Sequence, residues 1–373
     1  SRYHRKVDAP QEPYRALRSL RPTYWTPVYR PGDEAGGVEV LKPGFGMETA
    51  GWDLVGRHEF ALSAAFSGGA GTFNGGGSYT FSGLGNPALS LAATQFHEAE
   101  PRALRGVTQG GDTVPLYLVE RERAVSLGAV FQRRRARTQS YLTLAGSHVR
   151  EDRTLLEENL SETTRFRLRQ PESSLLEGRA SLLFGNARIF PFSIGREDGV
   201  TAFVRARVRR ELSLADSLRG GEGTDRSYRD LVGQASAYLG FPGPGFGNHS
   251  LAIRGSWGIA AGPGADAYHF EVGGSAGQGL PVALGSAGQN LLFPVRGYPT
   301  AERFGKQGWS ATAEYRFPLS MLNRGPGLVP LHFGWLSAAL FVDAGNAWGP
   351  DTSLHGHLNP RRGTLVSVGG ELT

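Results

Sequence analysis

The chain has 373 residues, 39% of them hydrophobic and 10% aromatic, with a formal net charge of +6. No uninterrupted apolar run reaches the roughly 18–20 residues of a transmembrane helix, so a helical membrane protein is excluded. The absence of cysteine excludes disulfides, thiolate metal sites and a cysteine nucleophile.

Apolar side chains recur with a period of two along most of the chain, which predicts β-strands. In chain order the predicted strands are 22–30, 37–50, 58–67, 70–82, 87–97, 121–134, 138–150, 175–186, 198–212, 227–241, 248–261, 307–318, 334–345 and 363–373. Most are at least as long as the roughly 9–11 residues with which a tilted strand crosses a membrane. Strands of soluble sheets are usually shorter, at ~5–6 residues.

The predicted strand at 198–212 shows the clearest alternation. Arg205, Arg207 and Arg209 share one face, and small apolar residues occupy the other. Three arginines need water while the opposite face needs an apolar medium, and a membrane barrel with a wet lumen meets both demands. A half-buried strand in a soluble sandwich is the alternative for this strand alone. Since the arginines alternate along strands, the positive charge does not predict nucleic-acid binding.

The connections between the predicted strands also alternate in length. Short links fall at 51–57, 83–86, 135–137 and 242–247, and long polar links at 98–120, 151–174, 213–226 and 262–306. Short turns at one end and long loops at the other are typical of outer-membrane barrels. The sequence therefore predicts an all-β fold, an antiparallel transmembrane β-barrel in the cell outer membrane.

Three sequence blocks near the end of the chain carry a family resemblance. They are FPVRGY at 293–298, WSATAEYRFP at 309–318 and LFVDAGNAW at 340–348. With these blocks in this order the chain resembles the Omp85 superfamily, of the BamA/TamA or surface antigen D15 type. In that family a V-R-G-F/Y tip of the sixth extracellular loop precedes strands with E-Y-R-F-P and F-x-D-x-G signatures. The stretch from 14 to 25 also resembles the start of a family barrel behind a periplasmic domain.

Alternation places Glu314, Arg316 and Asp343 on the lumen side of neighbouring strands. The resemblance implies that the loop folds into this lumen and that Arg296 binds near Asp343. Arginine suits that role because its planar fork can pair with carboxylates. The expected loop motif is Val295, Arg296, Gly297 and Tyr298, and its expected lumen partners are Glu314, Arg316, Asp343 and Gly345. The alternative is that both carboxylates pair only with Arg316 or other lumen arginines.

The expected organisation is a linker at 1–20, arriving from an upstream periplasmic domain, followed by the barrel at 21–373. About sixteen strands form the family barrel, within the range of outer-membrane barrels, whereas about fourteen are predicted here. The final residues, 369–373, read as the middle of a strand. The barrel is therefore expected to lack its last strands.

Enzymatic motifs are weak. Residues 273–277 match G-x-S-x-G, but a nucleophile elbow needs a buried strand before it and a helix after it, and neither is predicted. The histidines show no metal-binding spacing, and no phosphate-binding loop precedes a helix. We expect no catalysis, no cofactor and no metal.

The leading functional hypothesis is an outer-membrane assembly factor that inserts other proteins through a lateral seam between its first and last strands. The expected partners are outer-membrane lipids and lipopolysaccharide, unfolded outer-membrane or secreted client proteins, and accessory lipoproteins. The alternatives are a two-partner-secretion pore, a barrel that anchors an upstream domain, and a diffusion porin, which the three blocks disfavour.

Overall fold

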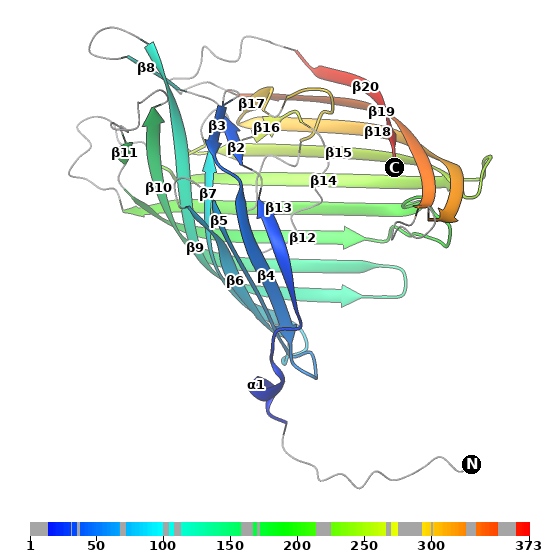
Figure 1. The fold of residues 1–373 in the computed structure, drawn as a ribbon, viewed down its shortest axis with the longest axis horizontal. Coiled ribbons are helices and arrows are strands. Elements are labelled where there is room, and N and C mark those ends of the chain that lie inside the picture. The colour runs from blue at the N-terminus through cyan, green and yellow to red at the C-terminus, as the bar shows by residue number, and fades with distance from the viewer. Residues whose placement is uncertain are drawn as a thin grey trace.

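A computed structural model describes residues 14–30, 32–35, 38–67, 72–99, 104–107, 113–157, 167–169, 172–213, 225–265, 270–274, 293–299, 301–325, 333–349 and 363–373. These residues form a strand-rich molecule built around one 16-stranded sheet (Figure 1).

The sheet is an up-and-down meander in which each main strand pairs antiparallel with the next. Its path runs through β1 (Tyr24–Arg30), β4 (Gly44–Trp52), β5 (His58–Ser67), β6 (Phe73–Phe81), β7 (Ala88–Ala99), β9 (Thr113–Arg134), β10 (Gln139–Glu157), β12 (Ser173–Gly185), β13 (Asp198–Ser213), β14 (Tyr228–Phe241), β15 (His249–Ala261), β18 (Gln307–Arg324), β19 (Phe333–Trp348) and β20 (Leu365–Leu372). Each of these strands overlaps one that the sequence predicts. The all-β, antiparallel fold class is confirmed.

The remaining strands are short. β8 (Leu104–Val107) pairs with β9, and β11 (Arg167–Arg169) pairs with β10. Two separate pairs are β2 (Asp33–Ala35) with β3 (Val38–Leu41), and β16 (Phe270–Val272) with β17 (Arg303–Gly305). The sequence predicts one strand over 37–50, and this is wrong. The chain breaks at Pro43, which has no N–H to donate to a ladder.

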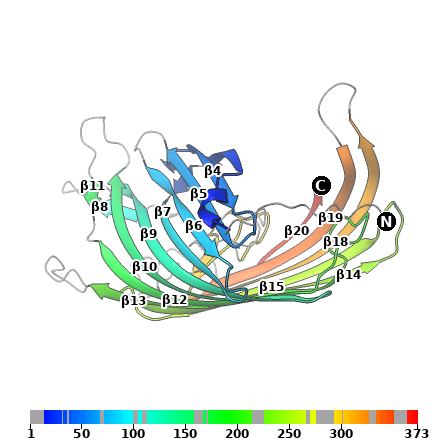
Figure 2. The same ribbon diagram turned by 90° about the horizontal axis from the view of Figure 1, so that it is seen from below.

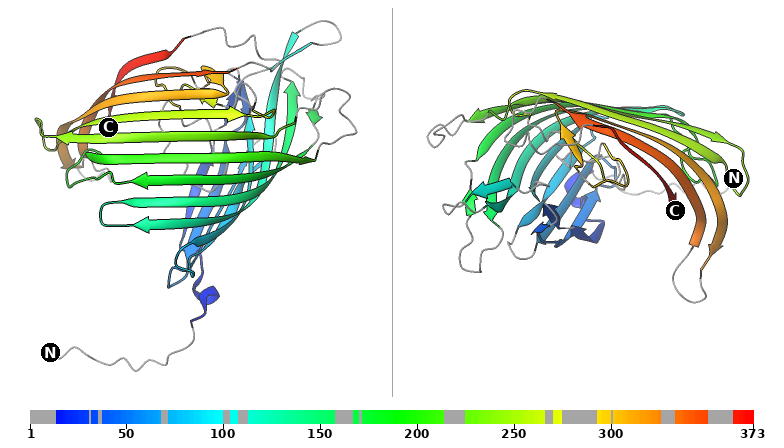
Figure 3. Two further views of the ribbon diagram at one scale, coloured as in Figure 1. Left: turned by 180° about the vertical axis from the view of Figure 1, so that it is seen from behind. Right: turned by 90° about the horizontal axis from the view of Figure 1, so that it is seen from above.

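The main sheet is strongly curved and forms an open trough (Figures 2 and 3). β1 and β20 lie at its two edges, and these two strands do not pair with each other in the described part of the chain. Residues on the outer face are apolar and exposed, including Leu127, Val208 and Leu340. Those on the inner face are polar or charged, including Glu177, Asp230 and Asp343, all of them buried. The alternation is that of a barrel with a polar interior.

Short turns join the strands at one end, and β9 and β10 extend far beyond the other end (Figure 1). They have 22 and 19 residues, about twice what a membrane crossing requires. The long links predicted at 98–120 and 151–174 therefore contain strand. The ladder continues because cross-strand partners such as Arg121 and Asp152 pair through their side chains.

Within the predicted linker, α1 (Ala16–Ser19) forms one helical turn. Tyr14, just before it, donates a hydrogen bond to Asp53 in the β4–β5 turn, and the Leu54 N–H lies 3.4 Å from Ser19 Oγ. These contacts join the start of the described chain to the short-turn end of the sheet. In the described residues, no helix has the length and apolar character needed to cross a membrane.

Candidate functional site

Two stretches of the connection between β15 and β18 come together as a compact unit. The Gly273 N–H donates to the Phe293 carbonyl at 3.1 Å, and the Gly274 N–H donates to the Tyr298 carbonyl at 3.1 Å. Gly274 and Val295 also form an isolated antiparallel bridge. These backbone bonds hold residues 293–299 as a defined turn on the concave side of the sheet (Figure 2).

An apolar cluster fixes this turn to the inner wall. Phe270, Val272, Phe293 and Val295 are fully buried. They pack with wall residues of β14, β15, β19 and β20, among them Val232, Ala260, Ala347 and Leu365. The rings of Phe270 and Phe293 meet edge to face, with centroids 5.5 Å apart. A sealed apolar contact inside a polar lumen stabilises the turn, because the same side chains would otherwise face water.

Arg296 extends from the turn to the carboxylate of Asp343 on β19. Its Nε lies 2.7 Å from Asp343 Oδ2, its Nη2 lies 2.9 Å from Oδ1, and its backbone N–H donates to Oδ2 at 3.1 Å. This is the paired, planar geometry in which arginine binds a carboxylate most strongly. The Asp343 side chain is 1% exposed, and its ion pair with Arg296 compensates the buried charge.

Glu314 on β18 completes the contact. Arg296 Nη1 donates to Glu314 Oε2 at 3.0 Å, while Arg316 Nε binds the other oxygen of the same carboxylate. The two outcomes weighed for Glu314 from the sequence, pairing with the loop or with Arg316, therefore occur together. We call Arg296, Asp343, Glu314 and Arg316 the Arg296 cluster.

Sequence reasoning missed two further partners. The guanidinium carbon of Arg296 lies 3.4 Å from the centroid of the Phe341 ring, and Nη1 lies 3.5 Å from Glu371 Oε2 on β20. Both side chains point into the lumen, because side chains two residues apart lie on the same face of a strand. Phe341 lies two residues from Asp343, and Glu371 is the register partner of Ala339, which also faces the lumen. Extending the alternation of the last two strands would have found them.

The other members of the predicted loop motif also contact the wall. Gly297 has φ +85°, a conformation that favours glycine. The Tyr298 hydroxyl donates to the Val366 carbonyl at 3.0 Å. Gly345 stands where the wall meets Val295, and a Cβ at this position would lie 2.7 Å from Val295 Cγ2 and 2.9 Å from the Trp309 carbonyl oxygen.

Arg205, Arg207 and Arg209 face the lumen from β13, but they belong to a second cluster. Arg207 binds Asp230, its cross-strand partner on β14. Arg209 binds Glu177, with Nε and Nη2 at 3.0 and 2.8 Å from Oε2, and it also binds Glu151. The expectation that these arginines need water is therefore wrong for Arg207 and Arg209, which are buried among carboxylates.

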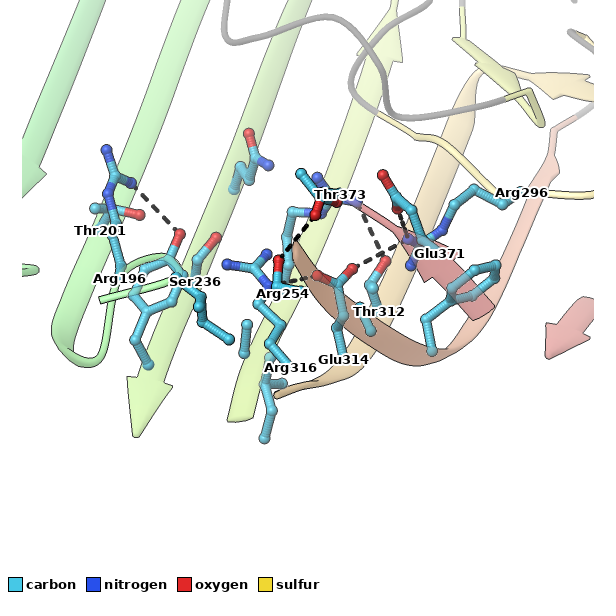
Figure 4. A pocket seen from close by; sticks show the side chains of 18 of the residues that line it. Arg196, Thr201, Ser236, Arg254, Arg296, Thr312, Glu314, Arg316, Glu371 and Thr373 are labelled. Carbon is cyan, nitrogen blue, oxygen red and sulfur yellow. Dashed lines mark hydrogen bonds and ion pairs between the residues drawn. The ribbon is translucent and has the colours of Figure 1, made fainter. Parts of the chain in front are cut away.

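A cavity of about 810 Å³ lies beside the Arg296 cluster in the trough. It is lined by Arg196, Arg254, Arg316 and Thr312 (Figure 4). Tyr238 also lines it. Arg196 contacts the Tyr238 hydroxyl and Arg254 contacts Thr312 Oγ1, at 3.4 and 3.3 Å. The space next to the cluster is thus a polar, basic part of the lumen.

The described residues do not include the serine of the G-x-S-x-G match at 273–277. Gly273 and Gly274 lie at the end of β16, and Ser275 lies outside the described residues. Among the described residues, no three His, Asp or Glu side chains are grouped closely enough to hold a metal ion.

Comparison with known proteins places the fold. A scan against protein-family models and a search of curated proteins found no match. A search of solved structures matches BamA from Haemophilus ducreyi lacking POTRA domains 1–3, with a TM-score of 0.52 and 14% sequence identity. The match covers 96% of this chain and 64% of the BamA chain, so the chain spans less than two thirds of that protein's length. At this identity the likeness shows the fold alone, which is similar to that of the BamA β-barrel.

Proposed function

We propose that this chain is the barrel of an outer-membrane assembly factor, which inserts unfolded client proteins into the membrane. The observation that carries the proposal is the Arg296 cluster, in which a loop turn inside a BamA-like fold pairs with two carboxylates of the wall. A buried apolar contact and a forked ion pair together give the loop one fixed position in the lumen. A fixed loop would brace β18, β19 and β20 while another part of the sheet opens.

The proposed point of opening is the seam beside β1. This strand has seven residues and pairs with β4 alone, whereas β10 has 19 residues and partners on both sides. The backbone groups on its other edge have no strand partner in the described residues, and such an edge can template an incoming strand. Each strand that a client adds satisfies backbone hydrogen bonds, so client folding supplies the free energy. The protein itself needs no catalytic step or cofactor.

The proposed partners follow from this mechanism. Outer-membrane lipids, lipopolysaccharide among them, surround the apolar outer face, unfolded client proteins meet the seam, and accessory lipoproteins deliver them. The basic cavity beside the Arg296 cluster also suits a secretion pore, in which a client passes through the lumen.

Depletion of the protein in its host tests the proposal and separates it from the pore. If it is an assembly factor, the amounts of many other outer-membrane barrels fall together. Complementation with Arg296→Ala should restore those amounts poorly, while Gly255→Ala, on the outer face of β15 with open space around it, should restore them fully. Loss of a single exported client, with all other barrels unchanged, would contradict assembly and favour the pore.

A further inference from the structure

At the end of the sheet opposite the short turns, five arginines of the described residues face outward from the wall formed by β9, β10, β12, β13 and β14. We call them the basic belt: Arg121, Arg123, Arg150, Arg210 and Arg229. Their direction follows from parity, because each stands an even number of residues from an exposed apolar side chain of its own strand, such as Val125, Leu144, Val208 or Leu231. The belt is therefore on the outer surface, separate from the lumen clusters.

The belt lies where the membrane face ends. Arg123 and Arg150 lie 11 residues from the short-turn end of their strands, and Arg210 and Arg229 lie 12 residues from it. These separations are at or just above the roughly 9–11 residues of a membrane crossing. If the short turns are periplasmic, as in outer-membrane barrels generally, the belt lies at the level of the outer-leaflet headgroups. This placement rests on the membrane location proposed above.

The belt carries more positive charge than its own carboxylates neutralise. Arg123 and Arg150 are direct cross-strand partners, a pairing that like charges disfavour. Asp152 and Glu172 offset part of this repulsion, with Arg123 Nη2 2.7 Å from Glu172 Oε2. Arg210 and Arg229 are exposed and form no ion pair with a described residue. Guanidinium groups of this kind bind phosphate well, because several N–H donors fit its oxygens.

A shallow, open groove lies next to the belt on the same surface, on the side toward the short turns. It has a volume of about 600 Å³ and is lined by Leu127, Leu144, Gly146, Gly178, Ala180 and Val208. A Cβ on Gly146 or Gly178 would meet no atom within 4 Å, so these glycines leave open space between the larger side chains. An apolar groove next to a basic belt matches the two parts of a phosphorylated lipid.

Among the described residues, the belt does not continue onto β1, β4, β5 and β6. At the same end of the sheet, the outward row on β1, β4, β5 and β6 consists of Tyr29, Phe45, Phe66 and Phe73, which are register partners. These rings suit a membrane interface but offer no charge. The basic wall therefore lies away from the β1 edge at which the proposed seam opens.

We propose that the basic belt and the groove form a binding site for a phosphorylated glycolipid of the outer leaflet, the lipid A part of lipopolysaccharide. The belt spans four inter-strand spacings of ~4.8 Å, about 19 Å in all, which exceeds the width of a single phosphodiester. A headgroup with more than one phosphate bridges it, while an acyl chain fills the groove. Binding there holds β9–β14 in the leaflet and leaves the β1 edge free to move.

The test is lipid A binding to the purified, folded protein in detergent, followed by native mass spectrometry. Lipid A should bind to the wild type. The triple variant Arg150→Gln/Arg210→Gln/Arg229→Gln should have an affinity at least tenfold weaker, because it lacks three exposed charges of the belt. It keeps the ion pairs that Arg121 and Arg123 form with Asp152. Gly178→Leu should weaken binding several-fold by filling the groove. The matched controls are Arg133→Gln, outward at the opposite end of β9, and Gly255→Leu, outward with open space on β15. Both should bind as the wild type does.

Unchanged binding by the triple variant, or equal binding of phosphatidylglycerol or dephosphorylated lipid A, would overturn the site. Heat-modifiable migration in gels checks that each variant is folded. Because this assay contains no client, loss of lipid binding and loss of client assembly are separate results. A variant can therefore disprove the lipid site without affecting the proposed assembly function, and the depletion experiment can disprove assembly without affecting the lipid site.

Discussion

Gly345 on β19 leaves the space that Val295 of the loop occupies. A Cβ on Gly345 would lie 2.7 Å from Val295 Cγ2, and the Trp309 backbone, only slightly farther away, closes the other side. The glycine of the F-x-D-x-G signature thus has a steric reason in this chain. Gly345 lies two residues after Asp343, so both face the lumen. One face of β19 therefore provides the carboxylate that binds Arg296 and the space that Val295 occupies.

Gly345→Ala should therefore displace the loop turn. The added methyl group forces Val295 or the backbone of β18 to move, and such overpacking costs about 1–3 kcal/mol. The measurement is the free energy of unfolding in urea, together with the rate at which protease cleaves the loop. Gly255→Ala is the matched control, because nothing lies within 4 Å of the added atom. Equal stability of the two variants would show that the gap is not needed.

Arg296→Ala should destabilise the folded barrel by about 3 kcal/mol, the lower part of the range for breaking a buried ion pair, because it leaves Asp343 buried and unpaired. Urea unfolding of the folded protein measures the change. Arg296→Lys should retain part of the stability, since an ammonium group cannot make the forked contact. In a double variant, Asp343→Asn should recover much of the loss by removing the uncompensated charge. A double variant as unstable as Arg296→Ala would argue against this cause.

The two ends of the β13 arginine row should respond differently to the same substitution. Arg209→Met should cost about 3 kcal/mol, the lower part of the range for breaking a buried ion pair, because Glu177 and Glu151 lose the partner that they share. Arg179 and Arg226 still compensate part of their charge. Arg205→Met should cost about 1 kcal/mol or less, since Arg205 lies 3.8 Å from Asp230, beyond hydrogen-bond distance. Both substitutions remove one charge from the same strand face, so each is the control for the other. Similar losses would contradict the difference in pairing.

The contact between Tyr14 and the β4–β5 turn should depend on pH. Burial alone would raise the pKa of Asp53, but the Tyr14 hydroxyl and the backbone N–H groups of His58 and Arg57 hold it below its ordinary value of 3.8. A lowered folded pKa stabilises the fold above pH 3.8, and this stabilisation is lost as the pH falls through the folded value. Carboxyl NMR titration should show Asp53 titrating below 3.8, and Tyr14→Phe should raise its pKa. A titration unchanged by that substitution would contradict the contact.

Alternation was enough to predict the main strands, because in a barrel one side chain in two faces lipid and the pattern needs no knowledge of distant partners. Glu314 and Asp343 could be placed in the lumen for the same reason. Their contact with Arg296 could be expected only from the family resemblance, since residues far apart in the sequence give no local signal of their pairing.

The parts that the sequence missed depend on tertiary partners. The β13 arginines have the pattern of a wet face, yet Glu177 and Asp230 on neighbouring strands bury Arg207 and Arg209. The break at Pro43 and the extension of β9 and β10 also depend on which chain lies alongside. The register between neighbouring strands determines which side chains are paired and where a strand ends. The sequence of a single strand carries no information on that register.

The position of the Arg296 turn inside the barrel is tested most directly by a disulfide, because the chain has no cysteine of its own. A Cβ at Gly297 would lie 3.8 Å from Ser367 Cβ, within the roughly 3.5–4.5 Å of a disulfide. Gly297→Cys/Ser367→Cys should cross-link in intact outer membranes. Gly297→Cys/Val366→Cys should not, since Val366 faces outward. A failure of the first pair to cross-link, or equal cross-linking of both pairs, would contradict a loop held against the inner wall.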